Sequence, residues 1–263
     1  MKLAERVALI TGAFGGIGRA TALALAEEGA DIALNDIESA AGNIRLAEDI
    51  KLLGRRVIIV PADVSDQKAA EDMVARTSSE LGRLDVYVSC AAYSAREPFL
   101  SADMADFRRT IDVTMWGAFH GLRASANQML KQSPGDSTSS RGSCILISST
   151  LAIRPIPGSM AYNMAKAAVD QMARTAASEL APHRIRVNVM HPGWVDTPGE
   201  QKFFKKESLV RMGHFLPWGR LALPEEIARG VVFLADPQSD YITGSTLTID
   251  GGMHLPPVKG RTN

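Results

Sequence analysis

Two residues of the sequence, Tyr162 and Lys166, have types and a spacing that could support acid and base chemistry. Residues four apart lie one turn from each other on the same face of a helix, so the ammonium can act on the phenol. A phenol has an ordinary pKa of about 10, and a neighbouring cation stabilises the phenolate and lowers that pKa toward neutral pH. The pair is therefore predicted to exchange a proton with a substrate, although the same spacing is common in helices with a purely structural role.

Three hydroxyl side chains, Ser148, Ser149 and Thr150, directly follow the apolar run 143–147, which is predicted to be a strand. In open parallel sheets, ligands bind outside the carboxyl ends of the strands. These hydroxyls are therefore expected to lie where the chemistry takes place.

A glycine-rich turn, Thr11 to Gly18, predicts a seat for a phosphate group. The residues before it form an apolar run typical of a buried strand, and the residues after it are rich in alanine and leucine, as in a helix. Gly12 would permit the tight turn, whereas Gly16 and Gly18 would let a pyrophosphate approach the backbone and the positive end of the helix. A turn that only reverses a strand into a helix would have the same composition.

Two acidic residues follow the next strands. Asp36 ends a predicted strand over 31–36, about twenty residues beyond the glycine turn. A carboxylate there can accept hydrogen bonds from both adenosine ribose hydroxyls and would repel a ribose phosphate, so Asp36 favours NAD over NADP. A turn aspartate at a strand end is the alternative. Asp63, after the third predicted strand, could receive the adenine amino group.

Strands alternate with helices along the whole chain, which predicts an α/β fold with a single Rossmann-type, doubly wound parallel sheet of about seven strands and helices on both faces. The further predicted strands are 57–60, 84–88, 143–147, 185–190 and 246–250, and the predicted helices are 19–28, 39–53, 66–82, 103–131, one that carries Tyr162, and 224–235. Residues 1–263 are expected to form one dinucleotide-binding catalytic domain. Residues 194–222 are expected to form a mobile substrate lid, and 246–263 the last strand and the C-terminal tail.

The predicted helix 103–131 carries Ile111, Met115, Phe119 and Leu122 at helical spacing, so this face is expected to be buried. Trp116 would lie on another face. Such a helix could pack against a second subunit or belong to an ordinary large core.

Composition excludes several classes of function. The 263 residues contain 29 lysines and arginines and 29 aspartates and glutamates, so nothing attracts the chain as a whole to nucleic acid or to an anionic membrane. No apolar run could span a bilayer, and the first strand leaves no room for a signal peptide, so a cytoplasmic location is expected. Cys90 and Cys144 are expected to be small core residues. His191 and His214 lack the spacing of metal ligands, and no metal is predicted.

Together these residues resemble the short-chain dehydrogenase/reductase family over nearly the whole chain. The motifs that carry the resemblance are the glycine turn, Asp63, Ser149 thirteen residues before Tyr162, the pair Tyr162 and Lys166, and the segment Pro192-Gly-Trp-Val-Asp-Thr197. The resemblance implies that Tyr162 donates or accepts the proton, that Ser149 positions the substrate oxygen, and that Lys166 lowers the tyrosine pKa and holds the nicotinamide ribose.

The resemblance also implies which residues hold the cofactor, NAD. These are Gly12, Phe14, Gly15, Gly16, Ile17, Gly18, Asp36, Ile37, Asp63, Val64, Cys90, Ala91, Tyr162, Lys166, Pro192, Gly193, Val195 and Thr197. Val195 and Thr197 resemble the residues that hold the carboxamide and a phosphate.

The chain departs from the family pattern at two places. Ser89-Cys-Ala-Ala92 stands where the family usually has Asn-Asn-Ala-Gly, and Val113-Thr-Met-Trp-Gly117 where it has Val-Asn-x-x-Gly. The second departure replaces a catalytic asparagine that supports a water chain leading from the lysine to solvent. Thr114 is hypothesised to hold that water imperfectly or through its hydroxyl.

The predicted function is an NAD-dependent oxidoreductase that transfers a hydride between nicotinamide and a secondary alcohol or its carbonyl partner. The tail beginning Asp250-Gly-Gly-Met253 resembles that of bacterial glucose dehydrogenases, which favours a sugar or polyol. The alternatives are an NADPH-dependent carbonyl reductase and a weakly catalytic, dinucleotide-binding regulatory protein. By resemblance, the protein is expected to be a homotetramer.

Overall fold

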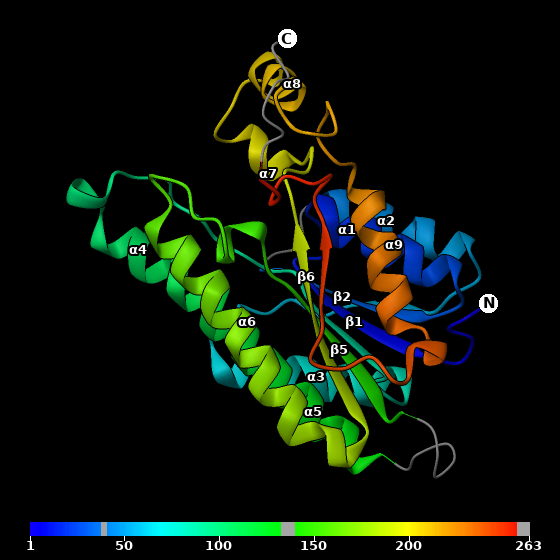
Figure 1. Cartoon of the computed structure of the whole chain (residues 1–263). Helices are drawn as coiled ribbons and strands as arrows, with labels where there is room; N and C mark the ends of the chain where they lie inside the picture. Colours follow the sequence, from blue (N-terminus) through cyan, green and yellow to red (C-terminus); the bar gives the residue numbers. More distant parts are fainter. Residues whose placement is uncertain (38–40, 133–139, 257–263) are drawn as a thin grey trace.

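The computed structural model describes residues 1–37, 41–132 and 140–256. Its strands are β1 (Val7–Thr11), β2 (Asp31–Asn35), β3 (Val57–Ile59), β4 (Val86–Ser89), β5 (Gly142–Ile147), β6 (Ile185–Pro192) and β7 (Thr246–Ile249). They form a seven-stranded sheet in the order β3-β2-β1-β4-β5-β6-β7, and every neighbouring pair is parallel (Figure 1). The predicted doubly wound parallel sheet is confirmed.

Helices cover both faces of the sheet (Figure 1). The α-helices are α1 (Gly16–Glu27), α2 (Ala41–Leu52), α3 (Gln67–Leu81), α4 (Met104–Ile111), α5 (Gly117–Lys131), α6 (Met160–Leu180), α7 (Pro198–Gln201), α8 (Lys206–His214) and α9 (Pro224–Ala235). Short 3-10 helices lie at Phe99–Ser101, Thr150–Ala152, Ala181–His183 and Pro237–Ser239. One face of the sheet packs on α1, α2 and α9, and the other on α3, α5 and α6.

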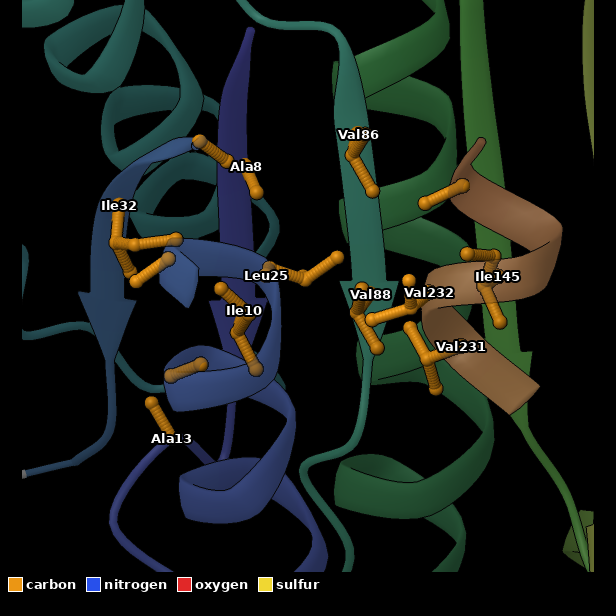
Figure 2. Packing of buried hydrophobic residues seen from close by; sticks show 14 of the residues in the cluster. Ala8, Ile10, Ala13, Leu25, Ile32, Val86, Val88, Ile145, Val231 and Val232 are labelled. Carbon is orange, nitrogen blue, oxygen red and sulfur yellow. The ribbon is translucent and has the colours of Figure 1, made fainter. Parts of the chain in front are cut away.

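The two cores follow from the alternation of side chains along each strand. In β1, Ala8 and Ile10 belong to the core beneath α1 and α9, whereas Val7 and Leu9 belong to the core beneath the helices of the opposite face. Figure 2 shows the first core, where Leu25 of α1 and two valines of α9 meet the strands. Both faces are apolar, which explains why the strands read as continuous apolar runs rather than as alternating ones.

The predicted helix 103–131 exists, but it contains a π-helical turn, Asp112–Trp116, between α4 and α5. The expected buried face is only partly correct, because Ile111, Met115 and Phe119 are half-buried. The fully buried positions include the small residues Gly117 and Gly121.

This helix packs closely against Tyr87 and Val64, which explains why small residues rather than large ones are buried on it. A Cβ at Gly121 would lie 1.9 Å from the Oη atom of Tyr87, and a Cβ at Gly117 would lie 2.5 Å from a methyl carbon of Val64. Small residues therefore face the protein interior, and the larger side chains are displaced to the margin of the contact.

Several element boundaries differ from the prediction by a few residues. Strand β4 begins at Val86 rather than at residue 84, and β6 continues to Pro192. Residues 38–40, where the second helix was expected to start, lie outside the described residues. The expectation that both cysteines are core residues holds for Cys144, which is fully buried in β5, but Cys90 lies just after β4 and is partly exposed.

Residues 194–222, which are expected to form a substrate lid, interrupt the alternation of strands and helices and carry α7 and α8 beyond the carboxyl ends of the strands (Figure 1). The two ends of this segment are tied together, because Asp196 N donates to Ala222 O and Ala222 N donates to Trp194 O, both at 2.9 Å. The two ends of this segment therefore lie side by side, and the segment forms a closed loop outside the sheet. Within the described residues, no helix is long and apolar enough to cross a membrane.

Candidate active site

A cavity of about 690 Å³ runs along the carboxyl ends of the strands, at the edge where the order of the sheet reverses between β1 and β4. This is the place where ligands bind in open α/β sheets, and the volume is typical of a ligand site. Of the predicted site residues, all but two line it. These lining residues are Gly12, Gly15, Gly16, Ile17, Gly18, Asp36, Ile37, Asp63, Val64, Cys90, Ala91, Ser149, Tyr162, Lys166, Pro192, Gly193, Val195 and Thr197.

The glycine turn leaves backbone groups open at the start of α1. Gly12 has a φ of +63°, which favours glycine, and a Cβ there would lie 2.8 Å from the backbone of Ala91. A Cβ at Gly16 would lie 2.5 Å from the Thr197 side chain, so glycine lets Thr197 pack directly against the helix N-terminus. The start of α1, where Gly15, Gly16 and Ile17 line the cavity, is a cradle suited to a phosphate group.

Gly18, also predicted to let a pyrophosphate approach, is required chiefly for packing within the protein. Gly18 lines the cavity, but a Cβ there would lie 2.1 Å from the carbonyl oxygen of Gly12. Close packing of α1 on its own turn therefore requires glycine at this position, whatever approaches from the cavity.

Asp36 lies beside the turn, as the sequence predicts. Its carboxylate accepts hydrogen bonds from Ile37 N at 2.9 Å and from Phe14 N at 3.4 Å. Phe14 is one of the two predicted residues that do not line the cavity, because its ring packs against the core beneath α1. Its backbone N–H instead helps to hold the Asp36 carboxylate toward the cavity.

Asp63 is held by groups that the sequence analysis did not single out. One oxygen accepts from Ser65 N at 2.9 Å and from Ser65 Oγ at 2.7 Å, and the other accepts from Arg109 Nη2 at 2.9 Å. Burial raises the pKa of Asp63, but the hydrogen bonds from Ser65 and Arg109 outweigh it, so the pKa lies below its usual value. The carboxylate is therefore a fixed acceptor at the β3 end of the cavity.

Ser149, Tyr162 and Lys166 meet at the opposite end of the cavity from Asp63. Ser149 follows β5, and its Oγ accepts from Leu151 N at 3.1 Å, which fixes the start of a 3-10 turn. Tyr162 and Lys166 lie on α6, and the Lys166 Nζ atom is 5.4 Å from the centre of the Tyr162 ring. Lys166 is only 4% exposed, and its ammonium donates to Ile147 O at 2.6 Å.

Burial has the largest effect on the pKa values of Lys166 and Tyr162. It lowers the pKa of Lys166 to about 8, against the opposing effects of Cys90 and Asp170. Burial and the Glu200 carboxylate raise the pKa of Tyr162 above its usual value, although Arg96 and the Ser149 hydroxyl act in the other direction. The expected shift of the Tyr162 pKa toward neutrality is therefore wrong for this state of the protein, because spacing on a helix does not reveal how far a side chain is removed from water.

Thr114, the other predicted residue outside the cavity, is buried in the π-helical turn. Its hydroxyl accepts from Tyr93 N at 3.0 Å and donates to Tyr93 O at 2.8 Å. The single hydroxyl proton is thus used, and Thr114 could only accept a hydrogen bond from a water. Together with Thr11, whose Oγ1 accepts from Cys90 N and Ala91 N at 3.1 and 3.2 Å, it fixes the loop that follows β4.

A buried acid–histidine pair lies one turn beyond Lys166. The carboxylate of Asp170 is 2.8 Å from His191 Nε2, and both side chains are at most 5% exposed. Tyr162, Lys166 and Asp170 follow one another at intervals of four along α6, so they share a face. His191 was set aside in the sequence because it lacks the spacing of a metal ligand, and its partner Asp170 lies 21 residues away in the chain. No group of three potential metal ligands occurs among residues 1–37, 41–132 and 140–256.

A glycine turn at a helix N-terminus, a carboxylate beside it and a tyrosine–lysine pair in one cavity are typical of dinucleotide-dependent oxidoreductases. Residues 12–254 match the family model described as enoyl-(acyl carrier protein) reductase. The chain is 36% identical over 257 residues to L-rhamnose 1-dehydrogenase (NAD(P)(+)) of Sphingomonas sp. strain SKA58, covering 97% of this chain and 99% of that protein. It is 35% identical to cis-4-hydroxycyclohexanecarboxylate dehydrogenase of Sinomonas cyclohexanicum, with 95% and 96% coverage.

Among solved structures, a short-chain dehydrogenase/reductase from Mycobacterium marinum superposes with a TM-score of 0.89 at 32% identity and covers 97% of both chains. The chain therefore belongs to the short-chain dehydrogenase/reductase family. It is an oxidoreductase of the kind that uses a nicotinamide dinucleotide.

Thr114→Val tests whether the threonine acts through the loop. Valine keeps the shape but leaves the Tyr93 N–H and C=O without their partner, so the free energy of unfolding should fall by about 1–3 kcal/mol. We expect turnover to fall more than NAD affinity, and Thr114→Ser to retain both properties. Urea unfolding and steady-state kinetics measure these effects. Equal behaviour of the valine and serine variants would contradict this role.

Proposed function

We propose that the protein is an NAD-dependent dehydrogenase that oxidises a secondary alcohol, with a sugar or polyol as substrate. The observation that carries this proposal is the convergence of Ser149, Tyr162 and Lys166 at one end of a cavity whose other end holds the glycine turn and Asp36. The names of the two relatives support it, since one oxidises a sugar and the other a hydroxyl on a ring.

The cofactor would lie along the cavity. Gly12, Gly15, Gly16, Ile17 and Thr197 would hold its pyrophosphate, Asp36 and Ile37 the adenosine ribose, Asp63 and Val64 the adenine, Cys90 and Ala91 the ribose region, and Pro192, Gly193 and Val195 the carboxamide. Thr197 caps α7 and accepts from Glu200 N at 3.4 Å, so its hydroxyl proton remains available to a phosphate oxygen. When bound, the nicotinamide accepts or donates the hydride.

The protein supplies the proton transfer. Ser149 holds the substrate oxygen by a hydrogen bond. The Tyr162 phenolate oxygen takes the hydroxyl proton and becomes a phenol, while the hydride leaves the carbon that bears this hydroxyl. Negative charge then does not accumulate on the alkoxide oxygen. Tyr162 must be a phenolate to take this proton, and Lys166 lies close enough to its ring to stabilise that charge. Lys166 would also hold the nicotinamide ribose. In the reverse direction, Tyr162 returns the proton to a carbonyl oxygen.

The oligomeric state and location belong to the same proposal. Trp116 is 45% exposed, and its ring contacts Phe119 and His120 on the helix whose larger side chains are half-buried. We propose that this surface joins copies in a homotetramer; sedimentation velocity should show four copies, and a monomer at micromolar concentration would contradict it. The expected cytoplasmic location stays a prediction.

Tyr162→Phe removes the proton acceptor without removing the ring. Turnover of any alcohol substrate should fall by about a hundredfold or more, because general base catalysis contributes at least that much. NAD binding should remain detectable by calorimetry. Near-normal turnover would overturn the mechanism. A wild-type protein that binds NAD but turns over no alcohol or ketone in a broad panel would instead favour the regulatory, weakly catalytic alternative.

Asp36→Ser tests the choice of cofactor. The wild-type enzyme should have a kcat/KM with NAD about tenfold or more above that with NADP, because the carboxylate repels a ribose phosphate. Serine removes this repulsion, so the ratio should fall about tenfold. Asp72→Ser, which removes a carboxylate from the surface of α3, is the control and should leave the ratio unchanged. A wild-type preference for NADP would favour the alternative, a carbonyl reductase.

A further inference from the structure

An ion pair joins two distant segments at the catalytic end of the cavity. Arg96, in the loop after β4, donates from Nη2 to both carboxylate oxygens of Glu200 on α7 at 2.9 Å. Both residues line the same cavity as Ser149 and Tyr162, and their side chains are 18% and 26% exposed. The pair therefore forms part of the wall that a substrate would contact, and it fastens the lid segment to the body of the protein.

Aromatic rings hold the arginine in place. The Arg96 guanidinium carbon lies 4.3 Å from the ring centre of Phe203 and 5.1 Å from that of Phe204. The Phe204 ring lies against Trp194, with the centres 6.0 Å apart. Trp194 and Phe203 also line the cavity. A charged pair packed among rings in this way has few conformations, which suits it to a specific contact.

The pair lies close to the reacting phenol. Arg96 and Glu200 line the same cavity as Tyr162, and burial together with the Glu200 carboxylate raises the pKa of Tyr162, whereas Arg96 lowers it. A substrate whose carbinol oxygen is held between Ser149 and Tyr162 would thus bring its neighbouring substituents toward Arg96 and Glu200.

The hydrogen-bonding capacity of the pair is incomplete. Within the part of the chain that the structure describes, the buried Nη1 of Arg96 has no hydrogen-bond partner. The carboxylate of Glu200 accepts only from Nη2 in the contacts described above, so lone pairs remain on both oxygens. Because Arg96 and Glu200 both line the cavity, the wall presents a guanidinium donor and a carboxylate acceptor side by side, with no net charge.

From this geometry we propose that Arg96 and Glu200 are specificity-determining residues that bind a second hydroxyl, adjacent to the one being oxidised, on a neutral polyhydroxylated substrate. A hydroxyl matches the pair because it accepts from the guanidinium and donates to the carboxylate at once. A carboxylate would gain no net attraction from a pair without net charge, and an alkyl group would leave the remaining polar groups of the pair without a partner. This inference rests on the proposed function and names the substrate class more narrowly.

Two alcohols that differ by one hydroxyl test the proposal, cyclohexanol and 1,2-cyclohexanediol, each with saturating NAD. The wild-type enzyme should have a kcat/KM for the diol about tenfold or more above that for cyclohexanol, because a site built for a hydroxyl discriminates strongly against its absence. Glu200→Gln and Arg96→Met should each reduce that ratio about tenfold, mainly through the KM of the diol, because the loss for the diol exceeds any loss that the two alcohols share. Lys205→Gln replaces an exposed residue of the lid and should change the kcat/KM of neither the diol nor cyclohexanol.

The outcomes separate this proposal from the proposed function. A wild-type enzyme that oxidises both alcohols without preferring the diol would overturn the proposal and leave the function standing. An equal loss of kcat/KM for both alcohols in the two variants would also overturn the proposal, because the ion pair would then only hold the lid in place and play no part in selectivity. Thermal unfolding of each variant identifies a loss of folding, and Glu200→Asp, which keeps the charge, should then recover part of the diol preference if the proposal is correct. Oxidation of neither alcohol, nor of any sugar, by the wild-type enzyme would refute both.

Discussion

The burial of a lysine ammonium is the constraint on which the rest of this site depends. Lys166 is almost completely removed from water, and burial lowers its pKa to about 8, so the fold must supply what keeps the side chain charged near neutral pH. Ile147 O at the end of β5 accepts from the ammonium, and the Asp170 carboxylate lies one turn along the same helix face. The site therefore needs β5, β6 and α6 packed in one arrangement, which the large apolar core on that side of the sheet provides.

The two departures from the family pattern are linked in the structure, because Thr114 helps to hold the loop that contains Cys90. The loop after β4 lacks the usual asparagines, yet two threonine hydroxyls hold it. Thr11, at the end of β1, bonds to the start of the loop, and Thr114, in the π-helical turn, bonds to Tyr93. Each threonine bonds to backbone groups, so the side chains of the loop itself are free to differ. Cys90 and Ala91 can then line the cavity without also having to hold the loop.

Much of this could be predicted from local sequence. Continuous apolar runs identified the strands, and a spacing of four identified Tyr162 and Lys166 as neighbours on one face of a helix. Pairs of residues distant in the chain were not predictable, because Arg96, Arg109 and Asp170 look like ordinary polar residues until the fold brings Glu200, Asp63 and His191 to them. The raised pKa of Tyr162 was missed for a related reason, since burial is a property of the whole fold.

The most direct test of the account is the pH dependence of kcat for alcohol oxidation at saturating NAD, compared between the wild-type enzyme and Lys166→Met. A charged Lys166 favours the Tyr162 phenolate, whereas burial raises the pKa of the phenol, so the wild-type rate should rise with pH at a position set by these two opposed effects. In the variant the rise should move to higher pH, because the cation that stabilises the phenolate is gone. Profiles that superimpose after scaling would show that Lys166 does not set the ionisation of Tyr162 and would contradict the account.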